Sequence, residues 1–192
     1  MNDVFGFHLY FPFRPLTEVS AAIDGAASKF DLQLVDATGG RWPARTYELS
    51  GCSPLTLSFC LEEPWSQAEL AYLGRQKFEC LGAQRMQGFL TGVCDELGAR
   101  LGRSHGGGGY GLVQRDELDG ELQEIGWLQY LSSPIVKRWG LETLLKGPFA
   151  GAFPARDGAC VIQLGESPFE LPLPKSAAAA YLGVPVRRLG AD

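Results

Sequence analysis

The stretch VFGFHLYF, at residues 4–11, alternates large apolar side chains with glycine and polar side chains. Successive side chains of a β-strand point to opposite faces, so this pattern predicts a strand with one apolar face. That face would carry Phe5, Phe7, Leu9 and Phe11. The opposite face would carry His8 and Tyr10. The stretch LTLSFCL, at residues 55–61, alternates in the same way, with Thr56, Ser58 and Cys60 on its second face.

Two further segments carry apolar residues at helical spacing. Pro15 can open the first helix because the first residue of a helix needs no N–H donor. Its predicted stripe is Leu16, Val19, Ile23, Ala26 and Phe30. The second helix is expected to begin after Gly82 and to end at Gly102 as its cap. Its predicted stripe is Met86, Phe89, Leu90, Val93, Leu97 and Leu101.

The segment just before the second helix also has a helical signature. Ser66 and Glu69 have the spacing of a capping box, and Trp65 and Leu70 that of a hydrophobic staple, which predicts a helix from Ser66 to about Cys80. Further strands are expected at 32–35, 47–49, 110–113, 125–130 and 159–164, and helices after residue 134 and at 175–183. Strands and helices are grouped rather than strictly alternating. The prediction is an α+β fold: a single domain, 1–192, with a mainly antiparallel sheet packed against several helices.

Composition limits the function classes. The chain has 192 residues, of which 45% are hydrophobic, and a net charge of −5. Nucleic-acid binding needs a basic face, so it is not expected, whereas a basic protein partner fits the charge. No apolar run reaches the roughly 20 residues of a membrane helix, and no signal peptide is recognised. We therefore expect a cytoplasmic protein.

Five cysteines show no zinc-type spacing and are expected to be reduced thiols. With only two histidines besides, the chain is expected to hold no metal and no cofactor. Cys94 with His105 could form a nucleophile pair, but Cys94 lies beside an apolar stripe and is expected to be a core residue. His8 is expected to be a hydrogen-bonded structural histidine.

The stretch GRSHGGGGYG, at residues 102–111, contains a G-x-S-x-G pattern and literally matches G-x-G-x-x-G. A serine hydrolase needs a strand before the serine and a helix after it, and a base histidine downstream. The expected helix before Ser104 and the absence of any histidine after His105 both argue against this. A flexible connection is favoured, and a hydrolase using Ser104 and His105 is kept as an alternative.

The stretch RDELDGELQE, at residues 115–124, concentrates negative charge. Such runs are usually solvated faces. The alternative is an anionic patch that docks on a basic partner. Its five acids are Asp116, Glu117, Asp119, Glu121 and Glu124.

The residues that follow resemble a known protein group. Gly126-Trp127-Leu128 runs into Tyr130-Leu131-Ser132, and a later strand leads to Gly165-Glu166-Ser167-Pro168. This order resembles bacterial immunity proteins of type VI secretion and polymorphic toxin systems, immunity family 52 and related groups among them. Where one relative has a Gly-Asp-Asn-like stretch, this chain has Phe169-Glu170-Leu171.

The resemblance implies a non-enzymatic inhibitor that binds a cognate toxin, a nuclease with a restriction-endonuclease fold. Trp127 and Tyr130 match the group as fold residues. The resemblance supplies no contact residues. The five acids are our predicted toxin-binding residues, because a phosphate-binding cleft is basic. Buried anchors would add affinity, with Trp42, Tyr72, Tyr110 and Trp139 as candidates. The remaining alternative is an adaptor or chaperone that loads an effector.

Overall fold

The computed structural model describes residues 4–106, 113–169 and 175–184, without the side chains of residues 71 and 72. Its nine strands form one sheet in the order β2-β3-β4-β5-β1-β6-β7-β9-β8. Every pair of neighbours is antiparallel. The strands are β1 (Val4–Pro12), β2 (Gln33–Thr38), β3 (Ala44–Glu48), β4 (Leu55–Cys60), β5 (Trp65–Gly74), β6 (Leu101–Gly106), β7 (Leu128–Leu131), β8 (Gly151–Pro154) and β9 (Cys160–Gln163). The predicted single-domain α+β fold is confirmed.

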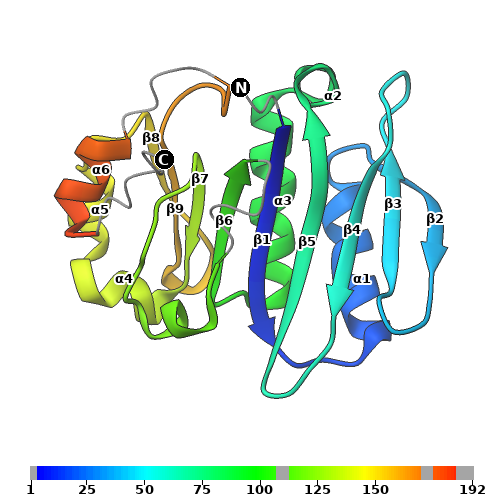
Figure 1. Ribbon diagram of the computed structural model, residues 1–192, viewed down its shortest axis with the longest axis horizontal. Helices are drawn as coiled ribbons and strands as arrows, with labels where there is room; N and C mark the ends of the chain where they lie inside the picture. The colour runs from blue at the N-terminus through cyan, green and yellow to red at the C-terminus, as the bar shows by residue number, and fades with distance from the viewer. Residues whose placement is uncertain (1–3, 107–112, 170–174, 185–192) are drawn as a thin grey trace, which may run out of the picture.

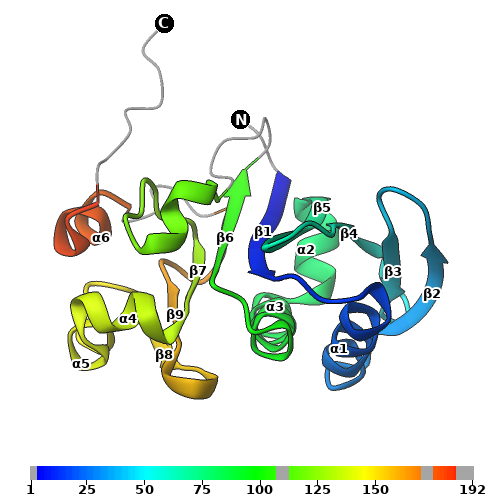
Figure 2. The same ribbon diagram turned by 90° about the horizontal axis from the view of Figure 1, so that it is seen from below.

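The described residues also form six helices and two short 3-10 turns. The helices are α1 (Leu16–Ser28), α2 (Arg75–Leu81), α3 (Ala83–Leu97), α4 (Ser133–Trp139), α5 (Leu141–Leu145) and α6 (Lys175–Leu182); the turns are η1 (Arg115–Asp119) and η2 (Arg156–Gly158). The predicted strand at 4–11 lies in the middle of the sheet, between β5 and β6 (Figure 1). In Figure 2, α1 and α3 lie on one side of the sheet and α4, α5 and α6 lie on the other.

The two sides of the sheet hold different cores. On the first side, the alternating apolar face of β1 packs against α1 and α3, and its four predicted members Phe5, Phe7, Leu9 and Phe11 are all buried. On the second side, apolar residues of β6, β7 and β9 pack beneath η1, α4, α5 and α6. The second core ends at β1, because the side chains that β1, β5 and β4 present on that side are mostly polar.

The predicted helix at 66–80 is wrong for most of its length, because residues 65–74 form strand β5. Strand β5 pairs with β1 over nearly its full length and with β4 on its other edge. Ser66, Ala68 and Leu70 are buried at every second position, which is strand spacing. The Ser66 hydroxyl does not cap a helix; it accepts a hydrogen bond from the Glu62 N–H (3.3 Å). Pairing on both edges outweighs the local capping signal.

The second predicted helix is confirmed but ends earlier than expected. Helix α3 stops at Gly98, which has a left-handed conformation (φ 63°), rather than at Gly102. Gly102 lies in β6, where a Cβ atom would come within 2.7 Å of the Phe7 ring. The expected flexible connection is therefore wrong for residues 102–106, which form a strand, and residues 107–111 lie outside the described residues.

The later elements follow the sequence more closely. Helix α4 begins at Ser133, β9 matches the apolar stretch at 159–164, and α6 matches the alanine-rich stretch, so these predictions are confirmed. The strand predicted at 125–130 forms at 128–131 instead. Of the strand predicted at 110–113, only Val113 is described, and it lies outside any strand.

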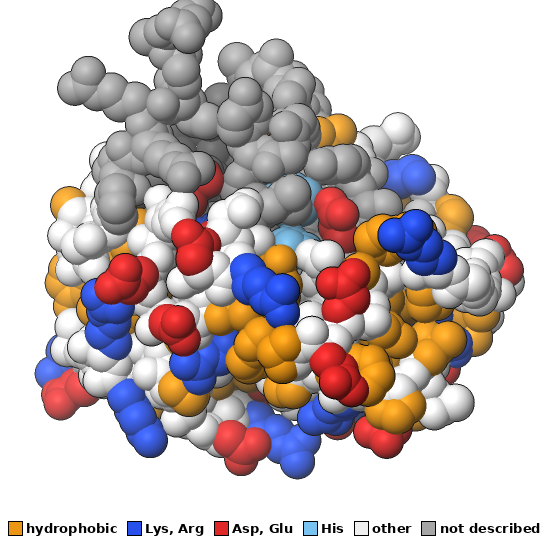
Figure 3. All heavy atoms as spheres, turned by 60° about the horizontal axis from the view of Figure 1, so that its bottom comes forward, with side chains coloured by type: hydrophobic (Ala, Val, Ile, Leu, Met, Phe, Trp, Pro, Cys, Tyr) orange, Lys and Arg blue, Asp and Glu red, His pale blue; other side chains and the backbone are white. Residues whose placement is uncertain are grey.

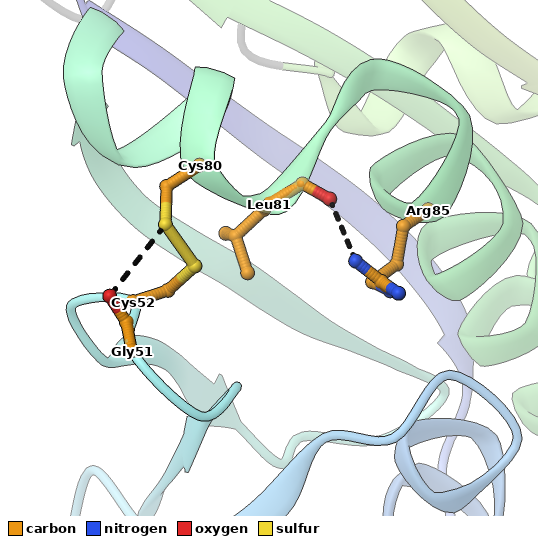
Figure 4. Close-up of a disulfide and its surroundings, with 5 residues drawn as sticks. All are labelled: Gly51, Cys52, Cys80, Leu81 and Arg85. Carbon is orange, nitrogen blue, oxygen red and sulfur yellow. Dashed lines mark hydrogen bonds between the residues drawn. A yellow bond between two sulfur atoms is a disulfide. The ribbon is translucent and has the colours of Figure 1, made fainter.

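Cys52 and Cys80 form a disulfide across 28 positions of the chain, so the prediction of five reduced thiols is wrong for this pair (Figure 4). The bond joins the turn between β3 and β4 to the end of α2. Cys60, Cys94 and Cys160 are free and buried. The spacing of the pair carries no motif, because the two residues meet only once β4 and β5 have placed α2 beside the turn.

Candidate functional site

A row of polar side chains crosses the second side of the sheet. The strand register places Ser58 of β4 opposite Glu69 of β5, and Glu69 opposite His8 of β1. His8 in turn faces Arg103 of β6, and Arg103 faces Gln129 of β7. Residues opposite each other in antiparallel strands point to the same side, so all five side chains share one face. The sequence missed Gln67 and Glu69 because their segment reads as a helix; as a strand, they fall on this face.

His8 is a buried, neutral member of this row. It is 6% exposed, and its Nε2 lies 3.0 Å from the Oε1 of Gln67. Burial lowers the pKa of His8 to about 4; the nearby His105 and Arg103 act in the same direction, and the hydrogen bond with Gln67 opposes them. His8 is therefore uncharged at neutral pH. The prediction of a hydrogen-bonded structural histidine is confirmed.

Arg103 and Glu117 form an ion pair inside the protein. Their side chains are 1% and 0% exposed, and the two terminal guanidinium nitrogens of Arg103 donate to the carboxylate, at 2.7 and 2.8 Å. The same carboxylate accepts the backbone N–H groups of Gln114 (2.8 Å) and Gln123 (2.9 Å). Arg103 also donates to the carbonyl of Glu124 (2.7 Å). Glu117 thus holds both ends of a loop against β6, a geometry that compensates a buried charge pair.

This loop contains the predicted acidic patch, and its five acids differ in their exposure to solvent. Asp116, Asp119 and Glu121 are exposed, and Glu124 is half-buried. Glu117 is fully buried and paired with Arg103, so its carboxylate is not part of the exposed acidic surface, and its role as a contact stays a prediction. A run of acidic residues in the sequence does not reveal which carboxylate is buried, because that depends on the position of Arg103 in strand β6.

Two hollows lie on this side of the sheet, and the second includes part of the polar row. One, of about 370 Å³, is lined by Asp116 and Glu121 from the acidic loop together with Arg138 and Trp139 at the end of α4. The other, of about 510 Å³, lies over β1, β4 and β5 on the polar side of the sheet. Figure 3 looks toward this side and shows histidine side chains between acidic and hydrophobic ones. Ligand sites in proteins have volumes of this order.

The geometry of β6 bears on the hydrolase alternative. Ser104 and His105 are consecutive in a strand and point to opposite sides of the sheet. The Ser104 hydroxyl is 4% exposed and accepts the backbone N–H of Leu128 at 2.9 Å. Ser104 lies inside strand β6, and within the described residues no helix follows it up to residue 106. The pair does not form a nucleophile–base arrangement. Cys94 is buried in the first core, which confirms its predicted place, and burial raises the pKa of its thiol.

The predicted anchors differ in their surroundings. Trp42 is 57% exposed. Trp139 is partly buried and its indole donates to the carbonyl of Leu182 at 3.0 Å. Trp127 and Tyr130 pack in the first core, which confirms them as fold residues. Tyr110 and the side chain of Tyr72 lie outside the described residues.

Within residues 4–106, 113–169 and 175–184, no three histidine, cysteine or acidic side chains gather as a metal site would require. In the same ranges, none of the helices combines the length and the apolar character needed to cross a bilayer.

Comparisons with known proteins test the family resemblance. No family model matches the chain, and no curated protein sequence matches it. Among solved structures, the chain is similar to the Pseudomonas aeruginosa T6SS protein PA0821, with a TM-score of 0.60 and 12% sequence identity. The superposition covers 94% of this chain and 72% of that one. The chain therefore shares the fold of this T6SS protein.

Proposed function

We propose that this chain is an immunity protein that binds and neutralises a toxin delivered by a type VI secretion system. The observation that carries the proposal is the shared fold with a T6SS protein over 94% of the chain. The resemblance of residues 126–168 to immunity proteins, immunity family 52 among them, points the same way. The proposed toxin is a nuclease with a basic, phosphate-binding cleft, and the proposed compartment is the cytoplasm.

The exposed acids of the loop after β6 are the proposed first contact with that cleft. Asp116, Asp119 and Glu121 lie on one short segment, and the inward-facing Glu117 holds that segment in place. A preordered acidic loop loses little conformational entropy when it binds. Opposite charge on the partner would raise the association rate roughly 10- to 1,000-fold at low salt. The net charge of −5 adds to this attraction.

The test uses the protein encoded by the adjacent reading frame. Expressed alone in a bacterial host, it should stop growth; expressed with this chain, it should not. The purified pair should form a complex in which the toxin's nuclease activity is blocked. A complex that forms while the activity remains would support an effector-loading adaptor instead. A candidate toxin that neither binds nor is inhibited would refute the proposal.

A separate experiment tests the contact made by the acidic loop. Reversing Asp116, Asp119 and Glu121 to lysine should slow association with the toxin and reduce its dependence on salt. The control reverses Glu18 and Glu142, two exposed acids on α1 and α5, and should slow association much less, because it changes the net charge but not the acidic loop. Equal association rates for the two sets of variants would show that the acidic loop is not part of the interface. The immunity proposal would then depend on the protection assay alone.

The proposal assigns no catalytic step to this chain. The variants Ser104→Ala and His105→Ala should retain protection wherever they remain folded. Loss of protection by a folded variant would place the strand β6 residues on the functional surface. Hydrolysis of ester or peptide substrates that disappears in Ser104→Ala would instead support the hydrolase alternative.

A further inference from the structure

The hollow over β1, β4 and β5 has an acceptor-rich, aromatic lining. Its described lining includes one charged side chain, the carboxylate of Glu69, which is 39% exposed. The ring of Trp42, 57% exposed, stands at its edge, and the ring of Tyr10 lines its wall. The side chains of Ser58 and Gln67 add polar groups.

The positive charges near this hollow are compensated or lie outside its lining. His8 lines it but is neutral near pH 7. Arg103 lies beside His8 in the strand register and is paired with Glu117. His105 Nε2 lies 3.6 Å from Glu69 Oε1. Arg41 and Arg115 act electrostatically on Cys60 and Tyr10 but do not line the hollow. The described lining of the hollow itself therefore carries one negative charge, that of Glu69, and no positive charge near pH 7.

The lining is suited to binding rather than to covalent chemistry. Cys60 is the nucleophile candidate here, but burial raises the pKa of its thiol, and the thiol donates to the Glu62 carboxylate at 3.3 Å. A protonated, hydrogen-bonded thiol is a poor nucleophile. A carboxylate together with an exposed aromatic ring instead suits a guanidinium group, which stacks on the ring and donates to the carboxylate.

The surrounding surface also distinguishes this part of the sheet. On the same side, over β6, β7 and β9, the strands carry Leu101, Leu131 and Ile162, which are covered by α4, α5 and α6. Over β1, β5 and β4 the side chains change to polar ones, and none of the described helices covers them (Figures 1 and 2). Polar side chains of this kind suit a wet or polar contact better than burial beneath an apolar helix face.

We propose that this hollow, defined by Glu69, Trp42, Tyr10 and Gln67, receives an arginine side chain from the toxin. The inference rests on the proposed function and adds a second contact beside the acidic loop. The guanidinium donates to Glu69 and stacks on Trp42, so the hollow supplies a buried anchor, whereas the acidic loop supplies charge attraction. Arginine and tryptophan are frequent among the residues that carry most of the energy of an interface.

The first test examines the hollow without any toxin. The probes are N-acetyl-arginine methylamide and its neutral isostere N-acetyl-citrulline methylamide, titrated into ¹⁵N-labelled protein. The arginine probe should shift the Trp42 indole signal, assigned with Trp42→Phe, and the citrulline probe should not. Glu69→Gln should weaken the affinity about tenfold or more, as expected for loss of a charge-assisted hydrogen bond. The control Glu18→Gln, on the opposite side of the sheet, should bind as the wild type does.

Three results would overturn the proposal: an unshifted Trp42 signal, equal shifts with both probes, or undiminished binding by Glu69→Gln. The Trp65, Trp127 and Trp139 indole signals report whether each variant stays folded. Since Glu69 and Trp42 are partly exposed, neither substitution removes a core contact.

The second test separates this inference from the proposed function. With the toxin in hand, Glu69→Gln and Trp42→Ala should speed dissociation of the complex about 10- to 100-fold, whereas Phe153→Ala, an exposed aromatic on β8, should not. If the wild type protects cells and these variants dissociate no faster, the hollow is not the anchor and the immunity proposal stands. If the wild type itself neither binds nor protects, the proposed function fails.

Discussion

Glu117→Gln should be one of the most damaging conservative substitutions in this protein. The carboxylate accepts two hydrogen bonds from Arg103 and one each from the backbone of Gln114 and Gln123, at 2.7–2.9 Å. An amide keeps the shape of the side chain but turns one acceptor into a donor that faces other donors. It also leaves the guanidinium of Arg103, 1% exposed, without its compensating charge.

The magnitude follows from burial. Removing one partner of a buried, hydrogen-bonded ion pair costs about 3–5 kcal/mol of the free energy of unfolding. For a chain of this length, each kcal/mol corresponds to about 2–4 °C, so the melting temperature should fall by roughly 6–20 °C. The matched control is Glu142→Gln. Glu142 pairs with Lys146 on the surface, with a side chain that is 82% exposed, and its loss should cost less than about 1 kcal/mol.

The assay is urea unfolding at pH 7, followed by circular dichroism and by tryptophan fluorescence. The double variant Arg103→Met/Glu117→Leu should recover only part of the lost stability. It avoids burying an unpaired charge, but the N–H groups of Gln114 and Gln123 and the carbonyl of Glu124 lose these hydrogen bonds. A Glu117→Gln protein as stable as Glu142→Gln would show that the pair does not hold the loop. A double variant less stable than Glu117→Gln would show that the unpaired charge of Arg103 is not the main cost of that substitution.

Four further predictions concern other parts of the molecule. Replacing Cys52 and Cys80 by alanine should lower the free energy of unfolding by roughly 3–4 kcal/mol, from closure of a loop of 28 positions, and reductant should shift the urea midpoint of the wild type but not of the variant. The pKa of His8 is about 4 in the folded protein, against 6.5 for an unperturbed histidine, so the unfolded chain binds more protons between these pH values. Stability should therefore be full above pH 6.5 and fall by up to roughly 3 kcal/mol as the pH drops through 4, and His8→Gln should flatten this slope in pH-dependent denaturation. Gly102→Ala should cost about 1–3 kcal/mol in thermal unfolding because its Cβ would meet an aromatic ring at 2.7 Å, whereas Gly39→Ala, with open space around it, should be tolerated. The protein should give no gel shift with DNA or RNA at submicromolar concentration and physiological salt, and a shift there would contradict the account in which it acts on a toxin.

The sequence by itself determined the framework of the fold. The alternation at 4–11 and 55–61 is a property of each strand alone, because it follows from the two faces of an extended chain. The stripes of α1 and α3 likewise follow from 3.6 residues per turn. Grouped strands and helices then indicate an α+β fold, and the matching elements in the structure occupy nearly the same residues.

Only the tertiary structure decided the elements whose partners are far away in the chain. Residues 66–70 carry a local helix signal, yet they form a strand because β1 and β4 both pair with them. Glu117 is one of five similar acids in the sequence, and it is buried because Arg103 reaches it from β6. Cys52 and Cys80 meet only after folding. Hydrogen bonds, ion pairs and a disulfide between distant residues depend on where the whole chain places them, which no local pattern records.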